Sequence, residues 1–413
     1  MANIEDKQTV RELAKRYMEL ANGGAHAERR ARAKSTNDLK PVRPIVWINE
    51  IPWHEMDVDG QLRCVCEDEL ARSMEWQFRS MLFREKYFPA DTVAEPYYSV
   101  QKAARHTGGG SPRVKEDIIR SDEKNYIMSH HYNDVLDTEE SLEQIKASVI
   151  TADPEADKLR VAQAEELLGG VMPVKLQGGY FYFNPWDAVS QYRGVEPIMI
   201  DLALRPDFMH KTVGKFTDVA LSSLKQREEQ GLLDNGLQDL HCTPAYVSDL
   251  DDAFTQKPVP AKGVWIRGTA QLFGDVSPDM HEEFDFEYLK KLSDQCGLLY
   301  YGCCEALHNK IEKLKKFKNL RKIGVSPWAS VEKSAEQIGG SYVFSHKPNP
   351  ANVSGKFRKE AVVAEISNVI EHCMRNKCPY EFVLKDISTV TYRPQNLFEW
   401  SAAVQETIDK FYK

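Results

Sequence analysis

The stretch Leu299-Tyr-Tyr-Gly-Cys-Cys-Glu305 carries apolar residues that lead directly into two thiols and a carboxylate. It belongs to a predicted strand over 297–302, which a predicted helix over 307–317 and a predicted strand over 320–325 follow. An apolar run, a helix and another apolar run are typical of a strand–helix–strand unit in a parallel sheet. We therefore predict that the two thiols stand at the end of a buried strand.

The same alternation of strand and helix runs through the second half of the chain. Strands are predicted over 45–48, 94–100, 171–176, 263–270, 297–302, 320–325, 341–344 and 380–384. Helices are predicted over 9–34, 69–88, 207–230, 279–295, 307–317, 331–338, 359–374 and 396–412. A strand count near eight favours an α/β fold of the closed (β/α)₈ TIM-barrel type over an open sheet. We expect one domain over 1–413, with 1–43 as an N-terminal helical extension.

Composition excludes several functional classes. The chain has 413 residues, 42% hydrophobic content and a net charge of -8, which argues against nucleic acid as a partner. No run of 18 apolar residues occurs, so no membrane span is predicted. No G-x-G-x-x-G or Walker A pattern follows a strand, which argues against a nucleotide-binding fold. We expect a cytoplasmic protein whose eight cysteines are thiols or ligands.

In a barrel of this type the working residues lie where the strands end. Reading the predicted strand ends in order gives a set of polar and thiol side chains: Asn49, Glu50, His54, Glu55, Gln177, His241, Cys242, Gln271, Asp275, Cys303, Cys304, Glu305, Ser326, His346, Lys347, Lys385 and Asp386. Scattered surface polarity does not usually place cysteine at such positions several times. The set therefore predicts a chemical site at one rim.

From this set, the aromatic residues near it and the His130–His131 stretch, we predict catalytic and substrate-binding residues. The predicted catalytic residues are Glu305, His54, Glu55 and His241. The predicted substrate-binding residues are Trp53, His131, Gln177, Tyr180, Gln271 and Lys347. An alternative for His54 and Glu55 is a loop ion pair, and only one of His130 and His131 can face a pocket from a strand.

The thiol pair also predicts a metal site. Sulfur ligands with nitrogen or oxygen partners suit Zn²⁺. His346 stands at a strand end two strands after Cys304, so the barrel could bring both to one ion. Neighbouring residues on a strand point to opposite faces, so one of Cys303 and Cys304 should face the interior, and we favour Cys304. The alternative is that both cysteines are core packing residues.

Four stretches resemble the uroporphyrinogen decarboxylase-like superfamily, in its branch related to corrinoid-dependent methyltransferases. They are Val276-Ser-Pro-Asp-Met-His-Glu-Glu-Phe284, Tyr301-Gly-Cys-Cys-Glu305, Asn319-Leu-Arg-Lys-Ile-Gly-Val-Ser-Pro-Trp328 and Lys347-Pro-Asn-Pro350. The resemblance covers most of the chain and is strongest over 263–350. It implies a TIM barrel, and in the methyltransferase members a zinc ion held partly by a cysteine of the strand that aligns with 299–304.

The chain departs from two patterns of that superfamily. True uroporphyrinogen decarboxylases carry Arg-Gln-Ala-Gly-Arg after the first strand, where this chain has Trp47-Ile-Asn-Glu-Ile-Pro-Trp-His54. Without these arginines a porphyrinogen has no carboxylate clamp. The methylthiol-specific methyltransferases carry His-x-Cys where this chain has Trp265-Ile-Arg-Gly-Thr-Ala-Gln271. Asp275 or His346 would then have to complete the ligand set.

The resemblance implies a zinc-dependent enzyme that moves a methyl group from a small O-methyl or N-methyl compound, such as an aromatic methyl ether, to cobalt. The chain has no corrinoid motif, so the corrinoid would come from a separate partner protein. One alternative is a metal-independent decarboxylase of a small carboxylic acid, with Lys347 or Lys385 on the carboxylate. A non-catalytic barrel that binds a tetrapyrrole or a corrinoid protein is a third hypothesis. A homodimer is compatible with the sequence.

Overall fold

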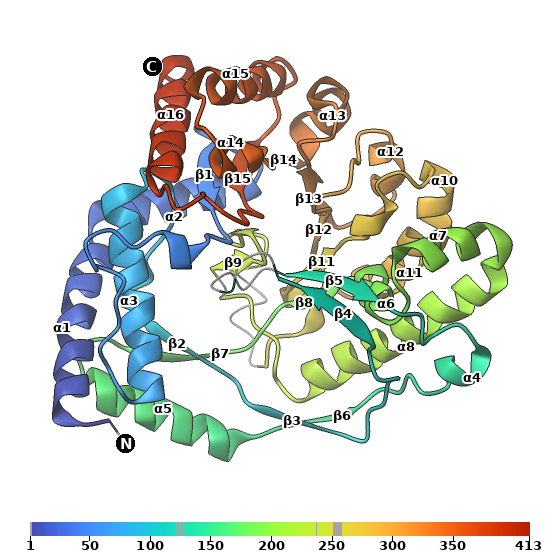
Figure 1. Ribbon diagram of the computed structural model, residues 1–413, viewed down its shortest axis with the longest axis horizontal. Helices are drawn as coiled ribbons and strands as arrows, with labels where there is room; N and C mark the ends of the chain where they lie inside the picture. Colours follow the sequence, from blue (N-terminus) through green and yellow to red (C-terminus); the bar gives the residue numbers. More distant parts are fainter. Residues whose placement is uncertain (1, 121–122, 124–127, 237, 251–257) are drawn as a thin grey trace.

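The protein is described from a computed structural model that covers residues 2–120, 123, 128–236, 238–250 and 258–413. Seven parallel strands form its central sheet in the order β1-β15-β14-β13-β12-β11-β8 (Figure 1). The strands are β1 (Ile45–Ile48), β8 (Phe181–Phe183), β11 (Trp265–Gly268), β12 (Leu298–Tyr301), β13 (Leu320–Val325), β14 (Val343–His346) and β15 (Tyr380–Leu384). The chain is therefore a mixed α/β protein, as predicted at the level of fold class.

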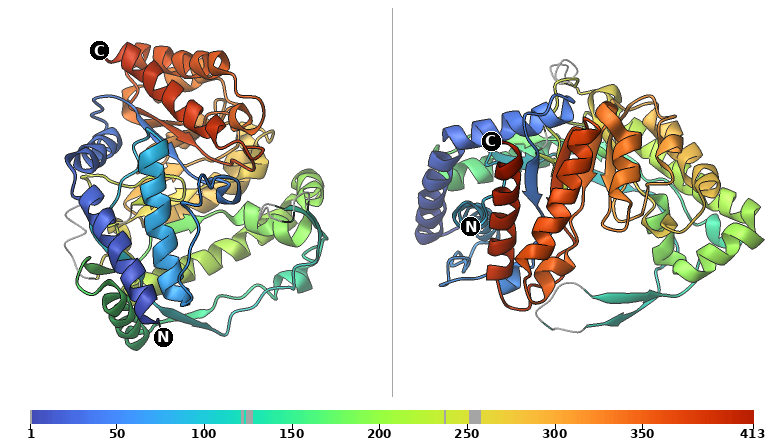
Figure 2. Two further views of the ribbon diagram at one scale, coloured as in Figure 1. Left: turned by 60° about the vertical axis from the view of Figure 1, so that its left-hand side comes forward. Right: turned by 90° about the horizontal axis from the view of Figure 1, so that it is seen from above.

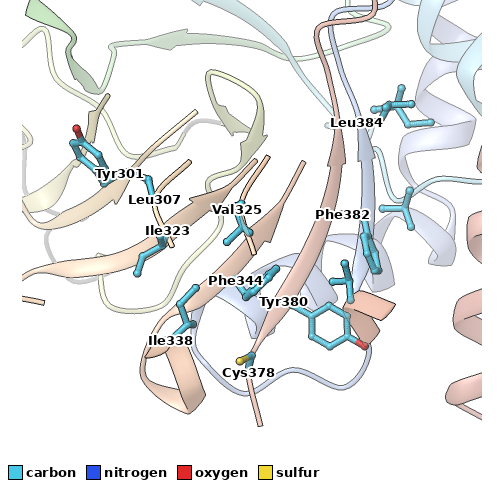
Figure 3. Packing of buried hydrophobic residues seen from close by; sticks show 14 of the residues in the cluster. Tyr301, Leu307, Ile323, Val325, Ile338, Phe344, Cys378, Tyr380, Phe382 and Leu384 are labelled. Atoms are coloured by element: carbon cyan, nitrogen blue, oxygen red, sulfur yellow. The ribbon is translucent and has the colours of Figure 1, made fainter. Parts of the chain in front are cut away.

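Apolar side chains of alternate strand residues pack outward against helices. Ile323, Phe344 and Phe382 are fully buried in this outer layer (Figure 3). The helices that cover it are α8 (Pro206–Glu229), α11 (Glu287–Ser293), α13 (Val331–Ile338), α15 (Lys359–Arg375) and α16 (Gln395–Phe411). Figures 1 and 2 show α15 and α16 side by side beyond the strands.

The residues between these outward positions face the concave side of the sheet. Tyr300 of β12 and Trp265 of β11 belong there to a smaller cluster with Leu240. Trp47 of β1 and Val383 of β15 contact Cys242 on the same side. The period of two in a strand thus separates an apolar outer face from an inner face of mixed character.

The N-terminal half of the chain contains more structure than the predicted helical extension over 1–43. The predicted helix over 9–34 is broken at Asn22–Gly23 into α1 (Ile4–Ala21) and α2 (Gly24–Asn37). α1 packs with α3 (Glu69–Tyr87) and α5 (Pro154–Leu168) around a second hydrophobic cluster. The expected strands at 94–100 and 171–176 correspond to β2 (Tyr98–Gln101) and β7 (Val174–Gln177), which pair with each other and not with the central sheet.

Two antiparallel pairs lie outside these layers. β3 (Ala104–Thr107) pairs with β6 (Val149–Ala152), and β4 (Glu116–Ile119) pairs with β5 (Ser129–Tyr132). Figure 2 shows the β4–β5 hairpin standing away from the helices. Within the described residues, no helix is long and apolar enough to cross a membrane.

Gly302 ends β12 and allows the chain to turn into the thiol pair. Its φ is +103°, and a Cβ there would lie 2.5 Å from Leu307 Cδ1 and 3.3 Å from the Gly324 nitrogen. Only glycine adopts such a conformation without strain, and it also permits this close approach to β13.

We expect Gly302→Ala to lower the free energy of unfolding by about 1–3 kcal/mol, because backbone strain adds to a steric clash. Urea titration measures this change. Gly24→Ala is the matched control, since a Cβ at Gly24 meets no atom within 4 Å. Equal stability of the two variants would contradict the role given to Gly302.

Candidate active site

The turn after β12 is held in place by the Glu305 carboxylate. Glu305 Oε2 accepts a hydrogen bond from the Cys303 backbone nitrogen at 2.8 Å, and Oε1 accepts one from Thr269 Oγ1 at 2.9 Å. The side chain is 2% exposed. The carboxylate predicted to be catalytic therefore fixes the backbone that presents the thiols, since a buried carboxylate is stable only when it accepts such bonds.

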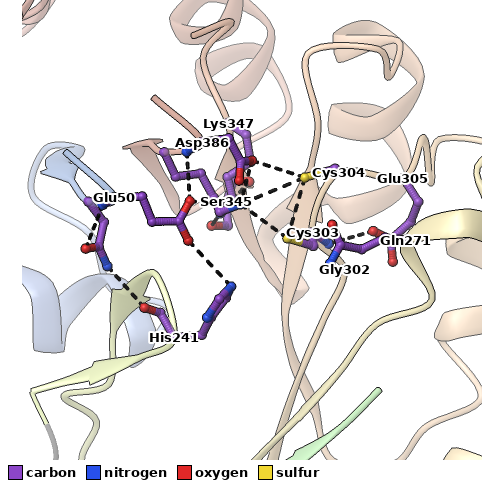
Figure 4. Close-up of polar contacts among 12 residues, drawn as sticks. Glu50, His241, Gln271, Gly302, Cys303, Cys304, Glu305, Ser345, Lys347 and Asp386 are labelled. Carbon is purple, nitrogen blue, oxygen red and sulfur yellow. Dashed lines mark hydrogen bonds and ion pairs between the residues drawn. The ribbon is translucent and has the colours of Figure 1, made fainter. Parts of the chain in front are cut away.

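The two thiols lie together at the end of the strand, beside Asp386 (Figure 4). Cys303 Sγ is 3.6 Å from Cys304 Sγ. Lys385 Nζ is 3.4 Å from the first sulfur and 3.8 Å from the second. Cys304 Sγ lies 3.2 Å from Asp386 Oδ2, and Lys385 Nζ is 2.5 Å from the same oxygen. One ammonium thus faces both sulfurs and a carboxylate.

This environment favours one thiolate in the pair. The hydrogen bond from Cys304 lowers the pKa of the Cys303 thiol, and His241, Arg267 and Lys385 lower it further against the opposing effect of burial. The same interaction raises the pKa of Cys304, so this group stays a thiol. The electrostatic environment therefore favours Cys303 over Cys304 as the thiolate, which is the reactive form of a cysteine.

Lys385 is the positively charged residue that lies beside this thiolate. Burial alone would lower the pKa of its ammonium, but Cys303, Cys304, Glu50 and Asp386 together raise it. Lys385 therefore remains charged at neutral pH, and it follows β15 directly.

Loops after two other strands complete the surroundings. Glu50, after β1, accepts from the Asp386 backbone nitrogen at 2.8 Å, and Glu50 Oε1 is 3.8 Å from His241 Nε2. His241 stacks on Tyr182 with ring centroids 5.6 Å apart. Both Glu50 (φ +50°) and His241 (φ +63°) adopt the left-handed region, which is uncommon for side chains other than glycine, asparagine and aspartate. Burial raises the pKa of Glu50.

The thiols open into a cavity of about 480 Å³. Its polar lining comes from Cys303, Cys304, Lys347, Lys385 and Asp386, together with Asn349, Ser354 and Ser388. Its apolar lining comes from Pro327, Trp328, Pro348, Pro350 and Ala351. A cavity of this volume with a few convergent polar groups is the usual form of a small-molecule site.

The inner face beneath the cavity is rich in cations. Lys322 Nζ lies 2.9 Å from Glu381 Oε1 and 3.0 Å from Oε2, with both side chains fully buried. Arg267 donates from Nη1 to the Gly302 carbonyl at 3.0 Å, and its guanidinium lies 4.5 Å from the Tyr300 ring centroid. These charges surround Cys303 from below.

The structure brings only part of the predicted set to this site. Cys303, Cys304 and Lys347 line the cavity, and His241 lies beside Cys303. Both sulfurs face the cavity because the turn at Gly302 ends the strand before them. The expectation that only Cys304 would face inward is thus corrected.

His346 does not reach the thiols. Its ring contacts those of Phe344 and Phe382 in the outer layer, and its Nε2 is 3.5 Å from Glu365 Oε1 of α15. Ser345 and Lys347, one residue away on either side, point inward instead. The position at a strand end was right, but the alternation of side chains places the imidazole on the opposite face.

Asp275 and Gln271 lie in the loop after β11. Asp275 is exposed and lies near Lys310, whose pKa it helps to raise against the larger lowering effect of burial. Gln271 donates from Nε2 to Asp187 Oδ2 at 3.0 Å. The described part of the chain contains no group of three or more His, Cys, Asp or Glu side chains arranged to hold a metal ion. The predicted ligand set of Cys303, Cys304, His346 and Asp275 is therefore not assembled.

Other predicted residues serve the scaffold. Glu55 accepts hydrogen bonds from Thr389 Oγ1 and the Val390 nitrogen, both at 2.6 Å, and so holds the loop after β15. His54 Nε2 lies 3.5 Å from Glu55 Oε1, which matches the loop ion pair considered as an alternative. Trp53 packs on Trp76 with ring centroids 5.5 Å apart.

The remaining predicted substrate-binding residues lie elsewhere or at the edge. Gln177 is buried and bonds to Ser99 Oγ at 2.8 Å and to the Gly236 carbonyl. Tyr180 lies near Arg267 and Cys242, and burial raises its pKa to about 12. His131 is exposed on the β4–β5 hairpin.

The residues that the sequence analysis missed are the charged ones inside strands. Arg267, Lys322 and Glu381 are each fully buried in apolar strands. A signal existed, because a lone charge in a strand that is otherwise apolar on both faces must find a buried partner or ligand. Glu50 and Asp386 were recognised as strand-end residues without a role, and Lys385 only as a carboxylate-binding residue of the alternative decarboxylase.

No family model and no curated protein matches the chain. Among solved structures, it is similar to a methyltransferase from Methanosarcina mazei, with 12% sequence identity over 93% of this chain and 99% of that chain, at a TM-score of 0.49. Similarity of this degree does not assign the chain to a family. The resemblance to the uroporphyrinogen decarboxylase-like superfamily stays a prediction.

Proposed function

We propose that the chain is a methyltransferase that takes a methyl group from a small O-methyl or N-methyl compound and transfers it to the cobalt of a separate corrinoid protein. The single observation that carries the proposal is the vicinal thiol pair, one member of which is a thiolate, at the wall of a cavity of about 480 Å³. Sulfur donors of this kind serve methyl-transfer chemistry chiefly as ligands of zinc.

The thiols fit zinc in chemistry and spacing. Their sulfurs are 3.6 Å apart, whereas two sulfurs at ~2.3 Å on one tetrahedral ion lie ~3.8 Å apart. Cys303 and Cys304 would supply two ligands and Asp386, 3.2 Å from Cys304 Sγ, an oxygen, although the described residues form no ready-made group of three such ligands. Zinc at this place supplies a Lewis acid that makes an alkoxide or amine a better leaving group.

The chain's own residues prepare the cavity for such a reaction. Lys385 holds Cys303 in its thiolate form, and the buried lysines stabilise negative charge that develops on a leaving oxygen. Trp328 and the prolines of the lining give the cavity an apolar wall. Methyl ethers are poor electrophiles, so this electrostatic support is the main contribution that the scaffold itself offers.

We further propose that the sheet is a variant of the (β/α)₈ barrel. The segment 239–244 lies between the edge strands β1 and β8, since Asn49 Nδ2, just after β1, donates to the His241 carbonyl at 3.1 Å and the His241 ring stacks on Tyr182 of β8 with centroids 5.6 Å apart. In such a barrel the segment 239–244 would take the place of the eighth strand.

Metal analysis tests the zinc site. We expect about one zinc ion per chain in protein prepared with zinc and dialysed, and a large loss in Cys303→Ser and in Cys304→Ser because each removes a sulfur ligand. His346→Ala is the matched control and should keep its metal. Equal zinc content in all four proteins, or no zinc in the wild type, would refute the site. The reaction is tested separately, by methyl transfer to a reduced corrinoid protein.

A second candidate is a metal-independent decarboxylase of a small carboxylic acid. The observation that favours it is the presence of Lys347 and Lys385 in the cavity lining. Release of CO₂ that persists after chelation would support this reaction, whereas a chelator should abolish the methyl transfer.

A further inference from the structure

Four cations lie in or under the cavity, and two of them have no carboxylate partner within the described residues. Lys322 pairs with Glu381, and Lys385 lies 2.5 Å from Asp386 and 3.6 Å from Glu50. Arg267 and Lys347 form no such ion pair with the described residues. Buried charge without a counter-charge is costly.

Lys347 is the one of these two cations that lines the cavity. Its side chain is 3% exposed, and its Nζ donates to the Ser345 hydroxyl at 2.6 Å. Among the residues that the structure describes, no carboxylate lies within 4.0 Å of this nitrogen. Burial lowers the pKa of Lys347, and an anion bound beside it would raise that pKa. The side chain therefore keeps donor capacity for an acidic ligand in the cavity.

Arg267, beneath the cavity, is the second cation without a carboxylate partner among the described residues. Its guanidinium is fully buried, and Nε and Nη2 have no hydrogen-bond partner within the described residues. The Tyr300 hydroxyl is likewise unpartnered there. Arg267 and Lys347 both face the Tyr300 ring, at 4.5 Å and 5.4 Å from its centroid. Buried donors of this kind normally have acceptors, so the pattern indicates that an acceptor is supplied from outside the chain.

The outer wall of the cavity has the opposite character. Trp328 and the lining prolines form an apolar surface, and Trp328 is 69% exposed. A ligand that fits both ends has a charged head and an apolar body. Phosphate alone would satisfy the cations but leave this wall without a contact.

We infer that the inner end of the cavity binds the carboxylate of a small organic acid through Lys347, with Arg267 supplying positive charge from beneath, and that the apolar body of the acid lies against Trp328. This subsite would define the substrate class of the proposed methyltransferase. Only the reaction, not the binding of the acid, rests on the proposed function. A methylated substrate would then carry a carboxylate remote from the methyl group. Binding of the acid requires neither zinc nor the corrinoid partner.

Calorimetric titration of the full chain tests this subsite with 4-methoxybenzoate, its uncharged analogue 4-methoxybenzamide and inorganic phosphate. We expect the acid to bind on the order of 10- to 100-fold more tightly than the amide, since a hydrogen bond to a charged group is worth that ratio. Lys347→Met should abolish this preference, so that acid and amide bind equally.

Lys310→Met is the matched control, because this buried lysine is held by the Phe273 and Gly274 carbonyls away from the cavity lining. It should keep the preference. Equal binding of acid and amide by the wild type would overturn the inference even if Lys347→Met fails to fold. Binding of phosphate without the acid would overturn the organic part. Acid binding without methyl transfer would refute the proposed function alone.

Discussion

Cys303→Ser should reduce methyl transfer by at least 10²- to 10³-fold, because serine at this position is neither a thiolate nor a sulfur ligand for zinc. The assay is the rate of methylation of a reduced corrinoid protein with a methyl ether or methylamine as donor. The hydroxyl is nearly isosteric, so the turn from Gly302 to Glu305 should survive, and thermal denaturation checks this.

The control for this variant is Cys64→Ser, which removes another partly exposed thiol outside the cavity. It should retain the wild-type rate. A Cys303→Ser enzyme with undiminished activity would show that the thiol pair is packing, as in the alternative interpretation of the sequence.

Glu381→Leu should lower the free energy of unfolding by about 3–5 kcal/mol, because it leaves the fully buried Lys322 ammonium without its carboxylate. Glu381 also accepts from Ser345 Oγ at 2.6 Å and from the Thr243 hydroxyl, and these bonds are lost as well. Urea denaturation measures the effect.

The double variant Lys322→Met/Glu381→Leu provides the matched comparison. Replacing both charges by apolar side chains removes the unpaired cation, so this protein should recover a large part of the lost stability. A double variant as unstable as Glu381→Leu would contradict the explanation by an unpaired buried charge.

The sequence predicted local features of this fold well. The strand over 320–325 coincides with β13, and the helix over 331–338 with α13. The start of α13 has a local signal, because the Ser330 side chain caps its first turn. The pairing of β7 with β2 was not predictable, because strand pairing depends on contacts between residues more than 70 positions apart.

The site was predicted only in part, because it too depends on contacts between distant parts of the chain. Strand ends pointed to Cys303, Cys304 and Lys347, all of which line one cavity. His346 was predicted to face the site because the alternation of side chains along β14 was not applied to it. The meeting of Glu50, His241 and Asp386 depends on three loops from distant parts of the chain, and no local pattern encodes it.

The most direct test of the account is the pH dependence of alkylation by iodoacetamide, followed by mass spectrometry of the peptides. The central claim is that the Cys303–Cys304 pair shares a thiolate, with the pKa of Cys303 held below its ordinary value by Cys304, His241, Arg267 and Lys385. Lowering the pH from about 8 to about 6 should then change the rate at this peptide less than about twofold, since the thiolate is not titrated in that range. The Cys64 thiol, whose pKa burial raises, should slow about tenfold per pH unit. A parallel tenfold loss per unit at both peptides would contradict the account.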